Sequence, residues 1–550
     1  PGTSVSLSWS VTNTTTLELN GTDVTGLTGT TVMPTVTTTY TLTATNANGS
    51  TSEDQRIRVV LPGEPIISEF MADNESGLLD EDGLPSDWIE IRNPTETTAD
   101  LDGYYLTDNS GLLTKWRFPA VTLAPNAYLL VFASSKDRAV AGSELHANFS
   151  LGANGEYLAL VKPDGTTIVT DFSPTYPNQL ANVSYGFDAV ALIEGFFLNP
   201  TPGSENAGGF TNFVADTSFS IDRGFYDTPI AVAITSATPG AEIRYTTNGA
   251  KPAANSGSIY TGPISISQTT VLRAAAFKAN HVPTNVDTHT YIFPAEVIAH
   301  PNMRTSVTQH ATYGPQMEDA LKAVPTISLV FQGDVDRAEK EASVELINFE
   351  AGDTQLDAGM ERFGNYVTNF SKRGIRLNFR NLYGPGKLTF PVFGGHDYAT
   401  IPPADKVDSI DLRSGNHDMN QRGAYMSNRF TDDTMLDMGN IAPHGRFVHV
   451  YLNGLYWGQY HMRERWSAAM MSEYFGGVKA DYESINANNS GNEFLAGTPS
   501  DGTGAQWAET QSLVSSATPF SSARSHLDME NVFNFMMLWV SGNSEREFRS

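Results

Sequence analysis

One short stretch constrains the fold of this chain more than any other. From Arg446 to Arg465, two runs of alternating residue types flank the dipeptide Asn453-Gly454. Both central residues of a type I′ turn need a positive φ, and Asn-Gly is among the dipeptides that meet this need best. The stretch therefore predicts two antiparallel strands joined by a two-residue turn.

Length and composition restrict the class of protein. At 550 residues the chain is too long for a single core, so we expect several domains. It has no cysteine, which excludes disulfides and cysteine chemistry. A net charge of −27 disfavours nucleic acid and anionic membranes as partners. No apolar run is long enough to predict a membrane span, and we attribute the lack of a signal peptide to where the sequence starts rather than to a cytoplasmic location.

The first part, residues 1–61, is rich in threonine and alternates in the manner of short strands. The dipeptides Asn20-Gly21 and Asn48-Gly49 mark two turns. Short strands at this spacing predict a β-sandwich. The run TTTYTLTATNANGS resembles the bacterial Ig-like modules of surface proteins, which implies a spacer or an adhesive module.

Residues 64–206 carry five short motifs in a fixed order. They are Ile66 to Ala72, Asp87 to Asn93, Leu101 to Leu106, Trp116 to Pro119 and Asn199 to Gly203. This order resembles the lamin-tail domain, an Ig-like β-sandwich that also occurs in bacterial exoproteins. The resemblance implies a second β-sandwich.

One loop of this second part concentrates carboxylates. Asp80, Asp82 and Asp87 lie close together in the sequence, and Ca²⁺ prefers six to eight oxygen ligands of this kind. The full twelve-residue calcium-loop pattern is absent, and Asp and Gly also favour ordinary turns. Both a weak Ca²⁺ site and a solvated acidic turn are therefore consistent with the sequence.

Residues 207–294 predict a third β unit. The segments Glu242 to Gly249 and Ile259 to Ile264 resemble the C-terminal β-sandwich module of chitobiases. In glycosidases this module is accessory and carries no catalytic carboxylate. Tyr245 and Tyr260 are either exposed platforms for sugars or members of the core of this module.

The last part, residues 325–550, contains ordered motifs besides the hairpin. They are SKRGIRLNFR from Ser371 to Arg380, the segment Tyr383 to Leu388, the segment Asp408 to Asn416, and a helix predicted over 425–439. Together with the hairpin they resemble the CotH family of atypical kinases. The resemblance implies an α+β kinase-like domain that uses ATP and Mg²⁺.

The resemblance also assigns nucleotide-binding residues. It places Lys372 against the phosphates and Glu464 after the hairpin, where it orients the pocket. It further places Tyr383 near the base and Arg413, with Asn416, in the cleft. Each has a structural alternative: an exposed strand charge, a pairing with neighbouring charges, or core packing.

The catalytic acids depart from the family pattern. After a helix predicted over Val532 to Val540, the first acid is Glu545 where the family has Asp. Glu can bind Mg²⁺, but its extra methylene moves the carboxylate by about an ångström, which in-line transfer tolerates poorly. The family's second acid lies in a later element that this sequence does not contain, so we expect residues 1–550 alone not to transfer phosphate.

These observations predict three β-sandwich modules followed by an incomplete α+β kinase-like domain, with residues 487–525 as an insertion loop or a partly disordered segment. The expected protein is bacterial and is secreted or on the cell surface. Its full-length form binds ATP and Mg²⁺ and phosphorylates extracellular or surface proteins. Two alternatives stay open: a degenerate relative without catalysis, and an adhesion scaffold whose β modules bind carbohydrate or cell wall.

Overall fold

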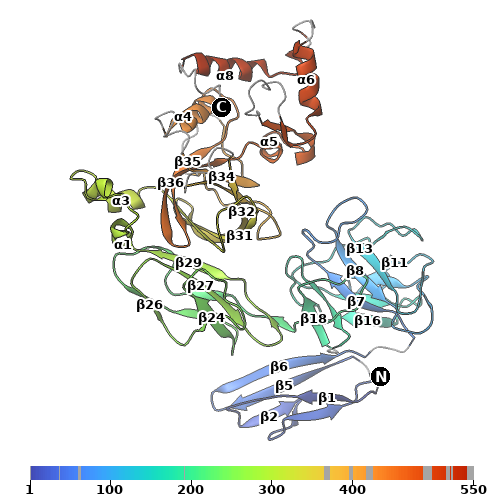
Figure 1. Ribbon diagram of the computed structural model, residues 1–550. Coiled ribbons are helices and arrows are strands. Elements are labelled where there is room, and N and C mark those ends of the chain that lie inside the picture. The colour runs from blue at the N-terminus through green and yellow to red at the C-terminus, as the bar shows by residue number, and fades with distance from the viewer. Residues whose placement is uncertain are drawn as a thin grey trace. The chain divides into compact units, whose positions relative to one another are not determined.

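The structure is a computed structural model, shown in Figure 1, and it describes most of the chain. The described residues are 2–35, 37–59, 63–190, 193–364, 372–394, 401–415, 425–486, 498–515, 521 and 524–541. Their contacts divide the chain into a first unit, residues 1–214 with 277–283, and a second unit, residues 215–276 with 284–550. Among the described helices, none has the length and apolar character needed to cross a membrane.

The first unit begins with a small β-sandwich, as predicted. One sheet pairs β1 (Val5–Ser8) with β4 (Gly29–Val32). The other has the order β3 (Thr22–Asp23), β2 (Thr16–Leu19), β5 (Thr38–Asn46) and β6 (Gly49–Ile57). Leu17 and Val24 are buried, whereas most threonines are exposed or half-buried. The core of this module is therefore thin.

A larger sandwich follows in the same unit. Its six-stranded sheet has the order β14 (Leu145–His146), β13 (Tyr128–Ala133), β8 (Asp87–Arg92), β7 (Ile66–Met71), β17 (Ser184–Asp188) and β18 (Ile193–Phe197). Its four-stranded sheet has the order β11 (Trp116–Arg117), β10 (Tyr105–Thr107), β15 (Leu158–Val161) and β16 (Ile168–Phe172). Two short pairs join β9 (Ala99–Asp100) to β12 (Thr122–Leu123), and β19 (Asn212–Phe213) to β28 (His281–Val282).

Aromatic side chains fill the core that these two sheets share. The ring of Phe70 lies 4.9 Å from that of Phe172 and 4.7 Å from that of Tyr176, measured between centroids. Such tilted and edge-on contacts stabilise a core beyond the area that they bury. This module thus has a larger buried core than the module before it.

The second unit begins with a smaller β module, which confirms the third predicted sandwich. Its main sheet has the order β21 (Gly224–Phe225), β29 (Asp287–Ile292), β27 (Thr270–Phe277), β24 (Glu242–Thr246) and β25 (Ser258–Ile259). Two further pairs join β20 (Thr217–Phe219) to β23 (Ile234–Ser236), and β22 (Ile230–Val232) to β26 (Ile264–Ile266).

A closed seven-stranded barrel dominates the rest of the second unit. Its order is β30 (Thr326–Phe331), β31 (Lys340–Phe349), β32 (Gly352–Phe363), β33 (Gly374–Asn378), β34 (Ser409–Arg413), β36 (Leu455–Glu464) and β35 (Gly445–Leu452). Parallel pairing of β35 with β30 closes it. The turn between β35 and β36 has φ of 49° at Asn453 and 82° at Gly454, which confirms the predicted turn.

Short helices precede the barrel and longer ones follow its strands (Figure 1). They are α1 (Pro294–Ala299), α2 (Thr305–Thr308), η1 (Gly314–Gln316), α3 (Met317–Lys322), α4 (Ser427–Asp437), α5 (Ala468–Phe475), η3 (Lys479–Asp481), α6 (Ala505–Ser515) and α8 (Met529–Ser541). A strand pair, β37 (Ser484–Asn486) with β38 (Thr498–Asp501), lies between η3 and α6. The helices predicted over 425–439 and 532–540 are confirmed by α4 and α8.

The prediction of a loop over 487–525 is wrong for residues 498–501, which form β38, and for residues 505–515, which form α6. The carboxylate of Glu483 accepts hydrogen bonds from the backbone N–H groups of Ala505 and Gln506, at 3.1 and 3.2 Å. These are donors that the first turn of a helix leaves unsatisfied. Glu483, which lies far upstream in the sequence, thus caps the first turn of α6. The composition of the predicted loop did not indicate this contact.

Candidate functional site

A row of charged side chains crosses the outer face of the barrel. Strand register places Glu361 opposite Arg376, Arg376 opposite Asp411, and Asp411 opposite Arg463. Side chains of directly opposed residues lie on the same face of a sheet. The neighbouring positions Met360, Ile375, Leu377, Ile410, Leu412 and Met462 belong to the barrel core. The charged row therefore lies on the face turned away from that core.

Ion pairs hold the middle of this row. The Arg376 Nε atom lies 2.8 Å from Asp411 Oδ1, and its Nη1 atom lies 3.5 Å from Glu361 Oε1. Burial disfavours the charged guanidinium, but the charges and hydrogen bonds of Asp411 and Glu361 together outweigh burial and raise the pKa of Arg376 above its usual value. Asp411 is 4% exposed. The guanidinium of Arg376 thus supplies both a hydrogen bond and an opposite charge to this buried carboxylate.

Helix α4 adds further charges at the Arg463 end. Arg429 and Asp432 of α4 are both buried, and Asp432 Oδ2 lies 3.6 Å from Arg463 Nη1. Burial raises the pKa of Asp432, although Arg463 and Arg429 oppose the shift. Burial also lowers the pKa of His461 well below its usual value, and the charges of Arg463, Arg429 and Arg413 lower it further. His461 is thus a neutral imidazole within a cationic neighbourhood.

Charged groups of both signs converge at this end of the row. Three guanidinium groups, of Arg413, Arg429 and Arg463, act on His461, and two buried carboxylates, of Asp411 and Asp432, act on Arg463. Arg429 is also paired with Asp433 at 2.6 Å, so the carboxylates match the guanidinium groups in number. Within the described residues, the buried Nε of Arg463 and the Nε2 of His461 have no hydrogen-bond partner. A buried polar group in this state costs about 1–3 kcal/mol. The buried Oδ2 atom of Asp432 is in the same state. An acceptor oxygen is the group that the Arg463 Nε–H can meet.

The structure brings two of the predicted nucleotide contacts together beside this row. The ammonium of Lys372, just before β33, donates to the carbonyl of Gln459, and Arg413 lies opposite His461. Lys372 and Arg413 thus meet β36 at Gln459 and His461, which are two residues apart. The Lys372 Nζ atom also lies 4.6 Å from the ring centroid of Tyr460. Burial lowers the pKa of Lys372 to about 8.

Glu464 lies apart from Lys372 and has a different set of partners. It is 1% exposed and accepts hydrogen bonds from the backbone N–H of His444 at 2.8 Å and from the Tyr474 hydroxyl at 2.9 Å. Five residues along β36 separate it from Gln459, about 16 Å at the usual rise of a strand. Its carboxylate therefore holds α5 and the segment before β35 in place, at a distance from the Lys372 ammonium.

Tyr383 is the fourth predicted contact, and the structure does not place it near Lys372. The two residues lie beyond opposite ends of β33, and Tyr383 is half-buried. Burial and the carboxylate of Glu339 raise the pKa of its phenol. A Cβ on Gly359 would come within 2.7 Å of its ring, so Tyr383 packs closely against β32. Glu545 and Asn416 lie outside the described residues.

The residues predicted to bind Ca²⁺ are engaged by cationic side chains. Lys136 Nζ lies 2.6 Å from both Asp80 Oδ2 and Asp82 Oδ2, and Arg138 Nη2 lies 2.8 Å from the latter. Asp87 instead accepts from the backbone N–H of Asn74, and burial raises its pKa to about 6. Calcium binding stays a prediction, and a bound ion would have to compete with the Lys136 ammonium.

The two tyrosines considered as sugar platforms pack against the core of their module. Tyr245 and Tyr260 lie among the partly buried side chains around that core. The Tyr260 hydroxyl also accepts a hydrogen bond of 3.1 Å from the backbone N–H of Ile234. Core packing accounts for both residues.

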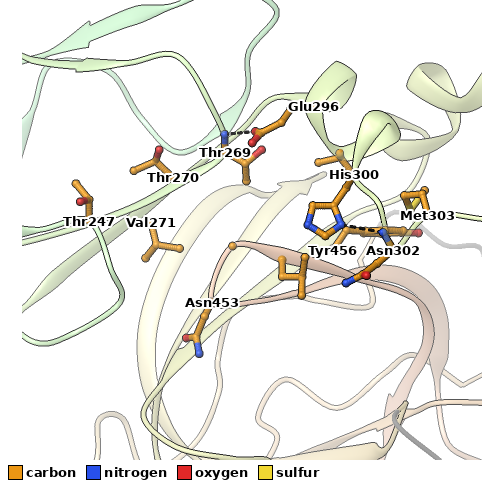
Figure 2. Close-up of a pocket in the computed structure, with 13 residues that line it drawn as sticks. Thr247, Thr269, Thr270, Val271, Glu296, His300, Asn302, Met303, Asn453 and Tyr456 are labelled. Atoms are coloured by element: carbon orange, nitrogen blue, oxygen red, sulfur yellow. Dashed lines mark hydrogen bonds between the residues drawn. The ribbon is translucent and has the colours of Figure 1, made fainter.

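A cavity of about 280 Å³ lies elsewhere, beside the turn between β35 and β36 (Figure 2). Its lining includes Thr270 of the small β module, Glu296 of α1, His300 and Tyr456. Glu296 accepts from the backbone N–H of Thr269, as Figure 2 shows. Tyr456 lies seven residues before Arg463 on β36, about 23 Å away along the strand. The cavity is thus separate from the charged row, and no sequence pattern indicated it.

The charged row itself was not predicted, although the sequence contains its signal. In GIRLNFR and SIDLRS, charged residues alternate with aliphatic ones. Alternation of this kind predicts one polar and one apolar face for each strand. The order of the strands decides that Arg376 meets Asp411, and local sequence does not specify that order.

Comparisons with known protein families agree with the architecture. The Lamin Tail Domain model matches residues 61–175, the Chitobiase/beta-hexosaminidase C-terminal domain model matches residues 221–288, and the CotH kinase protein model matches residues 363–533. No match is found among curated proteins. The three matches confirm the families that the sequence motifs resemble. The chain therefore carries, in order, a lamin tail domain, a chitobiase-type C-terminal domain and a CotH-like domain.

Proposed function

We propose that the CotH-like domain binds ATP with Mg²⁺ and that the full protein phosphorylates extracellular or surface proteins. The observation that carries the proposal is the convergence of three guanidinium groups on His461, together with the buried Nε of Arg463, a donor that has no hydrogen-bond partner among the described residues. Phosphoryl transfer depends on cations fixed against the phosphates. Groups already fixed in a protein stabilise such charge better than mobile water does.

The residues of the site take different parts in this proposal. Lys372 and Arg413 contact the phosphates with Arg463, whereas Glu464 is a positioning residue that fixes α5 through Tyr474. Asp411 and Asp432 already face guanidinium groups and keep them in place. The Mg²⁺ ligand is Glu545, which the resemblance implies. When bound, Mg²⁺ would neutralise charge on the phosphate oxygens.

A position outside the cell is part of the same proposal. The CotH-like and chitobiase-type domains are consistent with an extracellular or surface protein. The absence of cysteine poses no obstacle, because the aromatic core of the lamin tail domain holds that module together without disulfides. We infer a bacterial exoprotein whose β modules present the kinase-like domain to its substrate.

Binding of ATP by residues 1–550 in the presence of Mg²⁺ tests the proposal, by calorimetry or with a fluorescent nucleotide. We expect Lys372→Ala to weaken binding at least tenfold, because it removes an ammonium from the phosphates. The matched control is Lys406→Ala, since Lys406 is an exposed lysine of the same domain. Equal binding by both variants, or none by the unaltered protein, would refute the proposal. The second result would favour a non-catalytic scaffold.

A further inference from the structure

A buried histidine at the edge of the lamin tail domain faces two glutamates. His146, on the short strand β14, has a fully buried side chain. Its Nδ1 atom lies 2.8 Å from the Ser134 hydroxyl oxygen, and its ring stacks on Phe132 with 5.5 Å between centroids. The ring is therefore fixed in its orientation before any ligand arrives.

The other ring nitrogen of His146 points into an acidic cluster. His146 Nε2 lies 3.1 Å from Glu144 Oε1 and 3.7 Å from Glu81 Oε1, and it makes no hydrogen bond among the described residues. One ligand atom from each of the three residues falls within 4.8 Å of the other two. This spacing lets one ion contact all three.

The backbone holds the three residues in this arrangement. The N–H of His146 donates to the carbonyl of Arg138, and the N–H of Arg138 donates back, both at 2.9 Å. The N–H of Glu81 donates to the carboxylate of Glu144 at 2.6 Å, which ties the loop of Glu81 to the segment before β14. Preorganised ligands of this kind lower the cost of binding an ion.

The charge balance around the cluster favours a dication. Four carboxylates, of Asp80, Glu81, Asp82 and Glu144, face the two cations Lys136 and Arg138. With a neutral imidazole, two negative charges remain in excess. The Arg138 guanidinium lies 2.6 Å from Glu81 Oε1, as an outer partner often does with a ligating carboxylate.

The donor set decides which class of ion fits. An imidazole nitrogen beside carboxylate oxygens suits Zn²⁺ and related transition metals, whereas Ca²⁺ and Mg²⁺ prefer oxygen ligands alone. We propose that Glu81, Glu144 and His146 form a Zn²⁺ site in the lamin tail domain, with water completing the coordination. This site is distinct from the Asp80, Asp82 and Asp87 set and is independent of the proposed kinase function.

Titration of the metal-free chain with Zn²⁺ tests the proposal, by calorimetry and by the melting temperature of the first unit. We expect binding that raises this temperature, because an ion bound only to the folded state stabilises it. Co²⁺ should give visible absorption bands that shift when His146 is replaced. Glu144→Gln and His146→Gln should each weaken Zn²⁺ binding at least tenfold.

Two control variants isolate the site from general surface binding. Glu75→Gln in the same domain and His310→Gln in the second unit remove an exposed carboxylate and an exposed imidazole, and neither should change Zn²⁺ affinity. If His146→Gln fails to fold, the Zn²⁺ affinity of Glu144→Gln decides the test. Glu144 is only half-buried, so its replacement disturbs the fold less. No binding by the unaltered chain, equal binding by both site variants and the unaltered chain, or binding of Ca²⁺ in place of Zn²⁺ would overturn the proposal.

Discussion

Two sets of buried carboxylates, one in the lamin tail domain and one on the charged row of the barrel, have opposite kinds of partner. In the lamin tail domain, Glu69 and Glu90 lie opposite each other on β7 and β8, and both are 0% exposed. Their partners are hydroxyl and backbone N–H groups, such as the Ser68 hydroxyl at 2.6 Å from Glu90. In the barrel, the buried Asp411 lies against the guanidinium of Arg376.

The kind of partner indicates the role of each set of buried carboxylates. Thr201 and Gly203 donate backbone N–H groups to Glu69 and Glu90, so these carboxylates fasten the last loop of the lamin tail domain to its sheet. Neutral donors satisfy a buried acid without attracting a mobile ion. The barrel instead gathers three guanidinium groups around His461, with carboxylates among them. The first arrangement is structural, and the second supplies the charged donors that the proposed nucleotide site requires.

The largest expected effect is a loss of stability in the barrel when Arg376 is replaced. Arg376→Leu leaves the buried Asp411 carboxylate without its 2.8 Å partner, which should cost about 3–5 kcal/mol of unfolding free energy. Urea denaturation of the second unit measures it. The double variant Arg376→Leu with Asp411→Leu should recover most of the loss, because an apolar pair replaces the buried ion pair.

The control for this change is another arginine of the same domain. Arg380 pairs with Glu339 at 3.0 Å, but its side chain is 58% exposed. Arg380→Leu should therefore cost less than about 1 kcal/mol. Equal costs for the two variants would show that burial does not distinguish the row from ordinary surface charges.

The pH dependence of stability tests the role of burial at Glu90 in the lamin tail domain. Burial raises the pKa of Glu90 to about 7, and the hydrogen bonds from Ser68 and Gly203 reduce the shift without cancelling it. The folded state thus holds a proton that the unfolded state releases near pH 4.5, the ordinary pKa of a glutamate side chain. Stability should fall as pH rises from about 4.5 through 7, by at most about 3 kcal/mol.

The variant Glu90→Gln isolates this contribution. An amide keeps the shape and cannot lose a proton, so the variant should be more stable than the unaltered protein at pH 8 and nearly equal at pH 5. Chemical denaturation of the first unit, monitored by tryptophan fluorescence, measures both. Glu75→Gln, at an exposed position, should leave the pH profile unchanged. A Glu90→Gln protein that is less stable at pH 8 would contradict burial as the cause.

The elements that sequence predicted are those that local rules determine. The turn at Asn453-Gly454 follows from the φ that its two residues accept, and α4 follows from a helical run of eleven residues. Closure of the barrel depends on β30 pairing with β35, more than a hundred residues away. The cap of α6 by Glu483 is likewise distant from the helix it begins. Contacts of this kind follow from topology, and periodicity within one segment does not contain them.

The candidate site also depends on contacts between distant segments, which local sequence does not predict. The resemblance selected Lys372, Tyr383, Arg413 and Glu464 as one set, and the structure brings Lys372 and Arg413 to neighbouring positions of β36. Tyr383 and Glu464 lie apart from them, because β33 and β36 are long enough to separate residues at their two ends. The cluster around His146 was missed for a related reason, since Glu81 and His146 come from distant segments and form no spacing motif.

The smallest expected effect is a pH-dependent change in ATP affinity caused by Lys372. This prediction tests the proposed function of the barrel directly. Its ammonium is buried against the rings of Tyr460 and Tyr425, and burial lowers its pKa from 10.5 to about 8. A lysine that holds phosphate only while protonated should therefore weaken ATP binding as pH rises through 8. We expect about a tenfold loss between pH 7 and pH 9.5, equivalent to about 1.4 kcal/mol.

The variant Lys372→Arg separates charge from position in this measurement. A guanidinium stays protonated throughout the range, so its ATP affinity should be independent of pH even where its geometry lowers the affinity. A flat profile for the unaltered protein would place the phosphates elsewhere on the barrel and leave Arg463 and Arg413 as their contacts. A sloping profile for both proteins would assign the titration to another group. A slope in the lysine protein alone would show that the Lys372 ammonium of the barrel serves nucleotide binding, which the neutral donors around Glu69 and Glu90 cannot do.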